Sequence, residues 1–154
     1  MYTVERKSSQ DLDRIAIEDD ARLCFACSIC VGDCPAAKFS EDFNPRQIFL
    51  KVSLGIEEGL VGSDSPIWKC TTCYTCYERC PAGTKPLDVI LALRNLSLKR
   101  GDCPASVESV RKSVLKQGMA TVLTDHVKKL RSEMNLPDVD DGDKPELEKL
   151  TGED

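Results

Sequence analysis

Cysteine is the residue type in this sequence best suited to chemistry, and its nine copies follow a pattern. Eight of them form two runs with the same internal spacing, and the second run repeats the first at an offset of 46 residues. The runs are Cys24-x2-Cys27-x2-Cys30-x3-Cys34 and Cys70-x2-Cys73-x2-Cys76-x3-Cys80, each followed directly by proline. Thiolates are strong ligands for iron and zinc, so the duplication predicts two metal sites built on one plan.

The spacing favours 4Fe–4S clusters. Three cysteines separated by two residues can wrap three corners of a cubane cluster in one tight loop, and the fourth iron takes its thiolate from elsewhere in the chain. In two-cluster proteins with this spacing, the fourth cysteine of one run ligates the cluster held by the other run. We therefore assign Cys24, Cys27, Cys30 and Cys80 to cluster I, and Cys70, Cys73, Cys76 and Cys34 to cluster II.

Zinc is the alternative metal, and a zinc-stabilised interaction module is the alternative from a different functional class. Structural zinc sites usually take their ligands as two well-separated pairs of residues. Here three cysteines fall within seven residues, twice, which does not fit that pattern. A broad visible absorption band that bleaches on reduction would exclude zinc.

The remaining reactive residue types are weaker candidates. Cys103 lies between Asp102 and Pro104 at a predicted helix start, and we interpret it as a packed cysteine rather than a reactive thiol. His126, the only histidine, lies in a charged stretch and is expected at the surface. The sequence has no nucleophile–base pattern, phosphate loop or flavin motif. No catalytic residue is therefore assigned.

The composition is that of a soluble globular protein rather than a disordered or fibrous one. The 154 residues are 41% hydrophobic and 31% charged, and only 5% are aromatic. Residues 1–20 lack an apolar run, so we expect no secretory signal, and an odd cysteine count then favours metal binding over disulfides. The longest apolar run, residues 89–93, is far too short to span a membrane.

The net charge of −5 comes mostly from one end of the chain. Residues 137–154 contain eight acids and two lysines, which leaves 19 basic and 18 acidic residues elsewhere. A nearly neutral body excludes the basic field of a nucleic-acid-binding protein, so no nucleic-acid partner is expected. The tail itself is interpreted as a solvated end of the chain.

Helices must position the two cysteine runs. Asn44 and Pro45 predict a helix start, and the apolar spacing continues to Ile56 unless Gly55 ends the helix first. Residues 86–98 predict the most buried helix, and Lys99-Arg100-Gly101 is typical of its C-terminal end. Further helices are predicted over residues 104–116 and about 124–134, whereas residues 12–17 are ambiguous between helix and strand.

These patterns predict a mainly α fold with the two cysteine loops at its centre. We divide it into an N-terminal extension (residues 1–19), a helical domain holding both clusters (residues 20–136) and the acidic tail (residues 137–154).

The second run and its surroundings resemble the C subunits of heterodisulfide reductases. The resemblance rests on Trp68-Lys69-Cys70 through Cys80-Pro81, on residues 87–94, and on Asn44-Pro45-Arg46, and it covers about residues 20–100. That family belongs to the α-helical dicluster ferredoxins, which also include iron–sulfur domains of succinate dehydrogenase and glycerol-3-phosphate dehydrogenase. Ser28 departs from the family, whose first run often has glycine at this position.

The resemblance implies an α-helical dicluster ferredoxin with two 4Fe–4S clusters, located in the cytoplasm of a methanogen-like anaerobe. Such a protein would relay electrons singly from a flavin- and iron–sulfur-containing partner, the A subunit of the reductase, to its catalytic B subunit. The B subunit would reduce the mixed disulfide of coenzyme M and coenzyme B in methanogenesis. A larger complex with a hydrogenase or formate dehydrogenase is compatible with this role. The alternative within electron transfer is a related complex acting on sulfur compounds or another disulfide.

Docking of these partners would use exposed apolar patches and the loop of Tyr74 and Tyr77. The isolated chain is expected to reduce no disulfide, because all eight motif cysteines are committed to iron.

Overall fold

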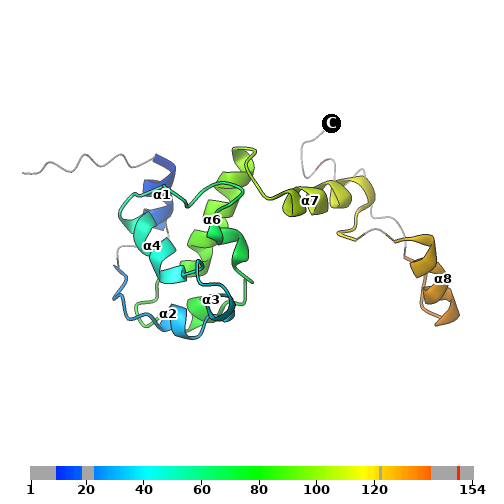
Figure 1. Ribbon diagram of the computed structural model, residues 1–154, viewed down its shortest axis with the longest axis horizontal. Helices are drawn as coiled ribbons and strands as arrows, with labels where there is room; N and C mark the ends of the chain where they lie inside the picture. Colours follow the sequence, from blue (N-terminus) through cyan, green and yellow to red (C-terminus); the bar gives the residue numbers. More distant parts are fainter. Residues whose placement is uncertain (1–9, 19–22, 122, 140–148, 150–154) are drawn as a thin grey trace, which may run out of the picture. The chain divides into compact units, whose positions relative to one another are not determined.

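The computed structural model describes residues 10–18, 23–121, 123–139 and 149, and no strand occurs among them (Figure 1). The mainly α prediction is therefore confirmed. Two compact units divide the chain, Met1–Pro104 and Ala105–Asp154. The helices of the described residues are α1 (Gln10–Glu18), α2 (Ile29–Gly32), α3 (Pro35–Phe39), α4 (Pro45–Ser53), the 3-10 helix η2 (Pro66–Lys69), α5 (Thr75–Glu78), α6 (Pro86–Lys99), α7 (Ala105–Gln117) and α8 (Asp125–Glu133).

Helix α4 begins and ends where its sequence predicts. The Asn44 side chain accepts a hydrogen bond of 3.0 Å from the Gln47 amide, which satisfies a donor that the first turn leaves free. The helix stops before Gly55, whose φ of 72° lets the Ile56 amide return to the Lys51 carbonyl at 2.9 Å. Ile56 therefore lies beyond the helix, and it is exposed.

Helix α6 carries more buried residues than any other helix of the described chain, as predicted. Its apolar residues cover most of its circumference, so it can pack against several neighbours at once. Gly101, at φ 70°, ends it by letting the Asp102 amide reach the Ser97 carbonyl at 3.0 Å. Helices α4 and α6 pack against each other and form the centre of the first unit (Figure 1).

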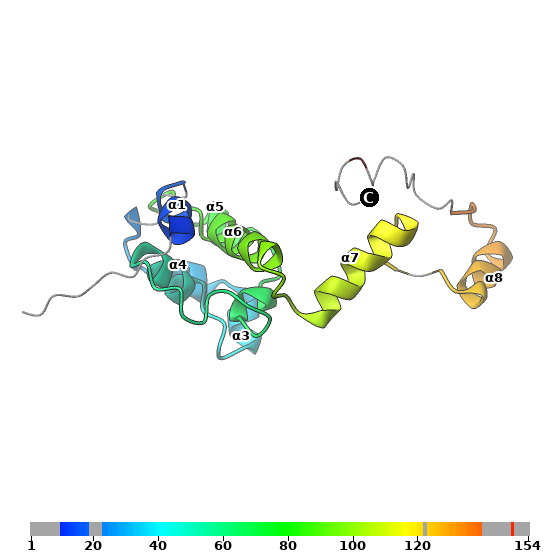
Figure 2. The same cartoon turned by 90° about the horizontal axis from the view of Figure 1, so that it is seen from above.

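Helix α1 completes this core. It packs against α4 and α6 (Figure 2), and Leu12, Ile15 and Ala16 are buried there. The ambiguous segment 12–17 is therefore helical. The sequence assigns these residues to an N-terminal extension, whereas in the structure they contribute to the core. The reason is the spacing of these three residues, which places them on one helical face.

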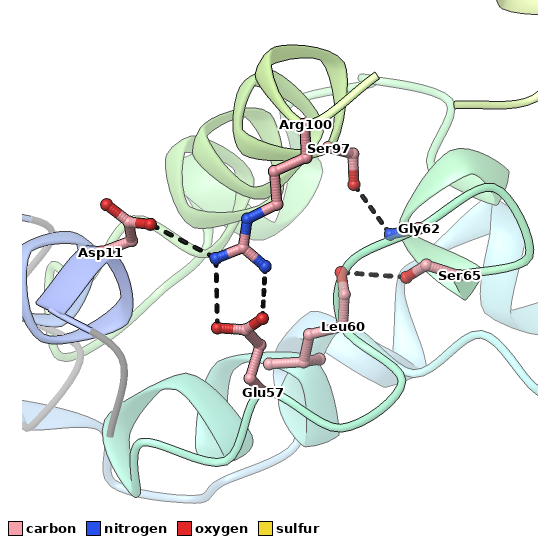
Figure 3. Close-up of polar contacts among 7 residues, drawn as sticks. All are labelled: Asp11, Glu57, Leu60, Gly62, Ser65, Ser97 and Arg100. Carbon is pink, nitrogen blue, oxygen red and sulfur yellow. Dashed lines mark hydrogen bonds and ion pairs between the residues drawn. The ribbon is translucent and has the colours of Figure 1, made fainter. Parts of the chain in front are cut away.

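The segment between α4 and η2 is held to α6 by polar contacts (Figure 3). Ser97 is fully buried, and its hydroxyl accepts a hydrogen bond of 2.9 Å from the Gly62 amide. Arg100 forms ion pairs with Glu57 and, at 3.3 Å, with Asp11 of α1. Ser97 in the last turn of α6 and Arg100 directly after the helix thus hold both the connecting segment and α1.

The second unit contains α7 and α8, close to the predicted ranges 104–116 and 124–134. Thr124 caps α8 by accepting a hydrogen bond of 3.4 Å from the Val127 amide. None of the described side chains of these two helices is buried. The sequence predicts one domain over residues 20–136, whereas the structure divides the chain after Pro104. Most of the acidic tail lies outside the described residues.

No helix of the described residues has the length and apolar character needed to cross a bilayer.

Candidate metal centres

Cavity I is lined by thiols from both cysteine runs. Cys24 and Cys27 come from the loop before α2, Cys30 lies within α2, and Cys80 follows α5. These are the four cysteines assigned to cluster I. The cavity holds about 380 Å³ of empty space, which includes space open to solvent.

Cavity II repeats this arrangement with the roles of the runs exchanged. Cys70, Cys73 and Cys76 line it from the second run, and Cys34, directly before α3, lines it from the first. The cavity is of similar size, about 300 Å³ by the same measure. Each predicted ligand set thus surrounds its own cavity.

The backbone of the two loops repeats as closely as their sequence. Ala26 and Ser28 have φ values of 55° and 66°, and their counterparts 46 residues later, Thr72 and Tyr74, have 51° and 61°. The short helices α2 and α5 are also 46 residues apart. Residues other than glycine rarely adopt this left-handed conformation, and glycine would adopt it at the position of Ser28 without steric cost.

Left-handed residues turn backbone amides toward the thiols. The Ala26 amide lies 3.4 Å from Cys24 Sγ and donates to it. In the second loop, the Thr72 amide acts in the same way on Cys70 and opposes the effect of burial on its pKa. Successive amides arranged like this form a concave site for anions, which suits a negatively charged metal–thiolate group.

The inner thiols resist ionisation without a cation. Burial, reinforced by the neighbouring Cys24 and Cys27, raises the pKa of Cys30 to about 11. Burial likewise raises the pKa of Cys76 to about 12, and the nearby Cys70 and Cys30 add to the shift. A bound metal would supply the missing positive charge, and four thiolates are the donor set that an iron–sulfur cluster requires. The residues present therefore fit such a cluster.

Hydroxyl groups touch one thiol in each cavity. Cys80 Sγ and Thr84 Oγ1 are 3.0 Å apart beside cavity I. Beside cavity II, Cys73 Sγ and Thr75 Oγ1 are 3.5 Å apart, and the Thr75 hydroxyl is the main reason that the pKa of Cys73 is lowered. These threonines can therefore stabilise negative charge on sulfur.

An ion pair joins the two loops. Arg79 Nη1 and Asp33 Oδ2 are 2.8 Å apart, and the two residues occupy equivalent positions, 46 residues apart in sequence. Helices α2 and α5 also contact each other. The loops therefore meet around an approximate two-fold axis.

A single metal ion would need its ligands to converge on one point. In the described part of the chain, no group of three or more His, Cys, Asp or Glu side chains does so. The eight motif cysteines are all within that part, and they surround the two cavities described above.

Comparison with known proteins identifies the family. Residues 20–84 match the model of the 4Fe-4S dicluster domain. The iron-sulfur C subunit of the CoB–CoM heterodisulfide reductase of Methanopyrus kandleri is 38% identical over 116 residues, which are 75% of this chain and 59% of the relative. The C subunit of the ferredoxin/F420H2-dependent CoB–CoM heterodisulfide reductase of Methanosarcina acetivorans is 36% identical over 133 residues, 86% of this chain and 81% of the relative. The chain belongs to the family of heterodisulfide reductase C subunits.

The match to the longer relatives is partial. The chain spans about three fifths of the length of the first relatives, including 63% of the C subunit of the H2:CoB–CoM heterodisulfide,ferredoxin reductase of Methanothermobacter marburgensis. The matched domain contains both cysteine runs, so the resemblance described from the sequence is confirmed. Membership of this family makes the chain an iron–sulfur protein of the dicluster type.

Two further residues singled out in the sequence are absent from the linings of both cavities. Cys103 lines neither cavity and follows the end of α6. His126 is exposed in α8.

Other residues at the cavities were not expected as site residues. Arg46 lines cavity I, and Thr84 and Thr75 contact thiols. The Asn44-Pro45-Arg46 motif was a signal for Arg46, since it placed this residue in the first turn of a helix between the cysteine runs. Nothing in the spacing of the threonines distinguishes them from surface residues.

Proposed function

We propose that this chain binds two 4Fe–4S clusters with crossed ligation. Cluster I would be held by Cys24, Cys27, Cys30 and Cys80, and cluster II by Cys70, Cys73, Cys76 and Cys34. The observation that carries this proposal is the lining of the cavities, each by three thiols of one run and the fourth thiol of the other. Anaerobic analysis should find about eight iron and about eight sulfide per chain. A plateau at about four would contradict it.

The clusters would make the chain an electron relay in a heterodisulfide reductase complex. A 4Fe–4S cluster accepts and donates one electron at a time, and its potential depends on its hydrogen bonds and exposure. Relatives are named as subunits of such reductases, which supports the same assignment here. The eight cysteines leave no motif thiol free to react with a disulfide, so the chain's own part is to hold the clusters and set their potentials.

The partners would be a flavin- and iron–sulfur-containing A subunit, which donates electrons, and a catalytic B subunit, which accepts them, in the cytoplasm of a methanogen-like anaerobe. The names of related proteins include hydrogen, formate, ferredoxin or F420H2. This variety supports attachment to a larger electron-input module, such as a hydrogenase or formate dehydrogenase, without choosing between them.

The two cysteine loops would offer different surfaces to these partners. Leu23, Phe25 and Ile29 beside cavity I are exposed, Phe25 by 70% of its surface. The equivalent residues beside cavity II are Lys69, Thr71 and Thr75. Apolar exposure favours a closely packed contact at the first loop, whereas the second loop is polar except at the exposed Tyr74 and the half-buried Tyr77. The two loops therefore suit two different partners.

A reconstitution experiment tests the relay. The iron-loaded chain would be reduced by a strong one-electron donor and then mixed with the coenzyme M–coenzyme B heterodisulfide. We expect reduced clusters without thiol release, and turnover once the catalytic partner is added. Sustained thiol production by the isolated chain would contradict the relay role.

A further inference from the structure

Arg46 brings a buried, unsatisfied donor to cavity I. It lies in the first turn of α4 and lines the cavity together with the four cysteines. Its Nε atom is buried and has no hydrogen-bond partner among the residues that the structure describes. Folded proteins seldom leave a buried charged donor unpaired, so its partner is expected among groups that the protein atoms alone do not supply.

The equivalent position in cavity II is apolar. Helices α4 and α6 both begin with proline, and Arg46 is the residue after the first proline as Leu87 is the residue after the second. Leu87 lines cavity II and is 1% exposed. The two cavities therefore have the same arrangement of thiols, but a charged side chain, that of Arg46, lines cavity I and none of the described residues brings one to cavity II.

Arg94 is a useful comparison, because protein acceptors bind its guanidinium group. Its Nε and Nη2 atoms donate to the Ile67 carbonyl at 3.1 and 2.9 Å, and Nη2 also donates to the Cys70 carbonyl at 2.6 Å. The guanidinium lies over the Trp68 ring, 5.6 Å from its centroid. Arg94 thus ties η2 to α6 through protein acceptors, whereas Arg46 Nε has none in the described part of the chain.

We propose that Arg46 Nε donates a hydrogen bond to a sulfur atom of the cluster in cavity I and thereby raises its reduction potential. The inference rests on the proposed binding of a cluster there. Reduction adds one negative charge to the cluster, and a charge-assisted hydrogen bond strengthens as its acceptor becomes more negative. Arg46 therefore favours the reduced state of cluster I. Within the described ranges no charged side chain lines cavity II, where Arg94 acts on Cys70 only through its charge and through the Cys70 carbonyl.

The test compares reduction potentials in the full chain loaded with iron and sulfide. Arg46→Leu installs the side chain that the other cavity already accommodates, and Arg46→Gln keeps a donor without the charge. Lys38→Gln removes one exposed positive charge outside both cavity linings and serves as the control. Potentials would be measured by redox titration followed by electron paramagnetic resonance, with iron content determined for every variant.

We expect Arg46→Leu to weaken the reduced state of cluster I by about tenfold, which is about 59 mV for a one-electron couple. Arg46→Gln should lower the potential by less, while cluster II and the Lys38→Gln variant keep their values. An unchanged cluster I potential in both Arg46 variants, with iron content intact, would overturn the inference.

Loss of iron from the Arg46 variants or from the unaltered chain would also decide between the inference and the proposed function. If both Arg46 variants lose cluster I while Lys38→Gln retains it, Arg46 is needed for assembly and the inference about potential is wrong. If the unaltered chain itself binds no iron–sulfur cluster in cavity I, the proposed function fails instead.

Discussion

Each cysteine run ends in a thiol that lines the cavity of the other run. Cys34 is followed by Pro35, which begins α3, and Cys80 is followed by Pro81, where the chain turns away. Proline fixes φ and cannot donate a backbone hydrogen bond, so it suits a position where the chain leaves the loop. The two exit points are therefore the places where each half of the first unit supplies a thiol to the cavity of the other half.

Substituting the exit cysteines should affect the opposite cluster. Cys34→Ser should alter the spectrum of the cluster held by residues 70–76, and Cys80→Ser that of the cluster held by residues 24–30. The reason is that each thiol lines the cavity of the other run. Electron paramagnetic resonance of the reduced variants would record the change. Cys103→Ser is the control and should leave iron content and spectrum unaltered, and a change confined to the cluster of the same run would show local ligation.

The two threonines beside the thiols allow a matched pair of substitutions. Thr84→Val should lower the potential of cluster I, and Thr75→Val that of cluster II, because each removes a hydroxyl in contact with a ligand sulfur. A hydrogen bond worth about 1 kcal/mol corresponds to a several-fold change in the reduction equilibrium. Redox titration of both variants would measure it. Equal shifts of both clusters in either variant would contradict a local effect.

The cysteines that line the two cavities were predictable because a repeated spacing is visible without a structure. The assignment of Cys80 to cavity I follows from the same rule. Arg46 and Thr84 were not predictable as site residues, because their importance depends on which side of a helix or turn faces a cavity. That orientation is set by packing between segments distant in sequence.

At the level of elements, local signals predicted the long helices well. Asn44 and Gly55 bound α4, and Gly101 ends α6, because capping and positive φ are properties of short sequence segments. The four-residue helices α2 and α5 were not predicted. They follow left-handed residues in the cysteine loops and are too short to show apolar periodicity. Helix α1 was ambiguous because its short apolar segment suits a strand as well.

The contact between α6 and the connecting segment predicts a stability effect. Ser97→Ala would leave the Gly62 amide without its buried partner, which costs about 1–3 kcal/mol. Thermal and denaturant unfolding of the iron-loaded chain would measure the loss. Ser109→Ala, at an exposed hydroxyl of α7, is the control and should change stability by less than about 0.5 kcal/mol. Equal stability of the two variants would contradict a structural role for this contact.

At the scale of the whole molecule, the first unit is small and its cysteine loops contribute little to the apolar core. Cys34 is the only motif cysteine in the buried cluster, while Cys24, Cys27 and Cys73 are exposed. Metal binding then supplies folding free energy that side-chain burial does not, as in other small metal-binding domains. The loops should therefore depend on the clusters more than the core helices do.

Removal of the clusters should loosen the loops selectively. Chelation of iron under reducing conditions should speed amide hydrogen exchange in residues 23–34 and 70–80, because their ordering depends on shared ligands. Peptides from α7, in the other unit, should exchange at an unaltered rate and serve as the internal control. Hydrogen exchange followed by mass spectrometry would measure both. Unchanged exchange in the two loops would show that they are ordered without metal.

The pairing of Asp33 with Arg79 has a consequence for how such a chain can arise. A residue on a two-fold axis between identical halves meets its own copy. If the halves were separate, identical chains, this position would bring acid against acid or base against base. Within one polypeptide, the two copies of the position carry opposite charges and attract each other at 2.8 Å. Covalent fusion of a duplicated half therefore converts a point of necessary repulsion into an attraction that a symmetric dimer cannot have.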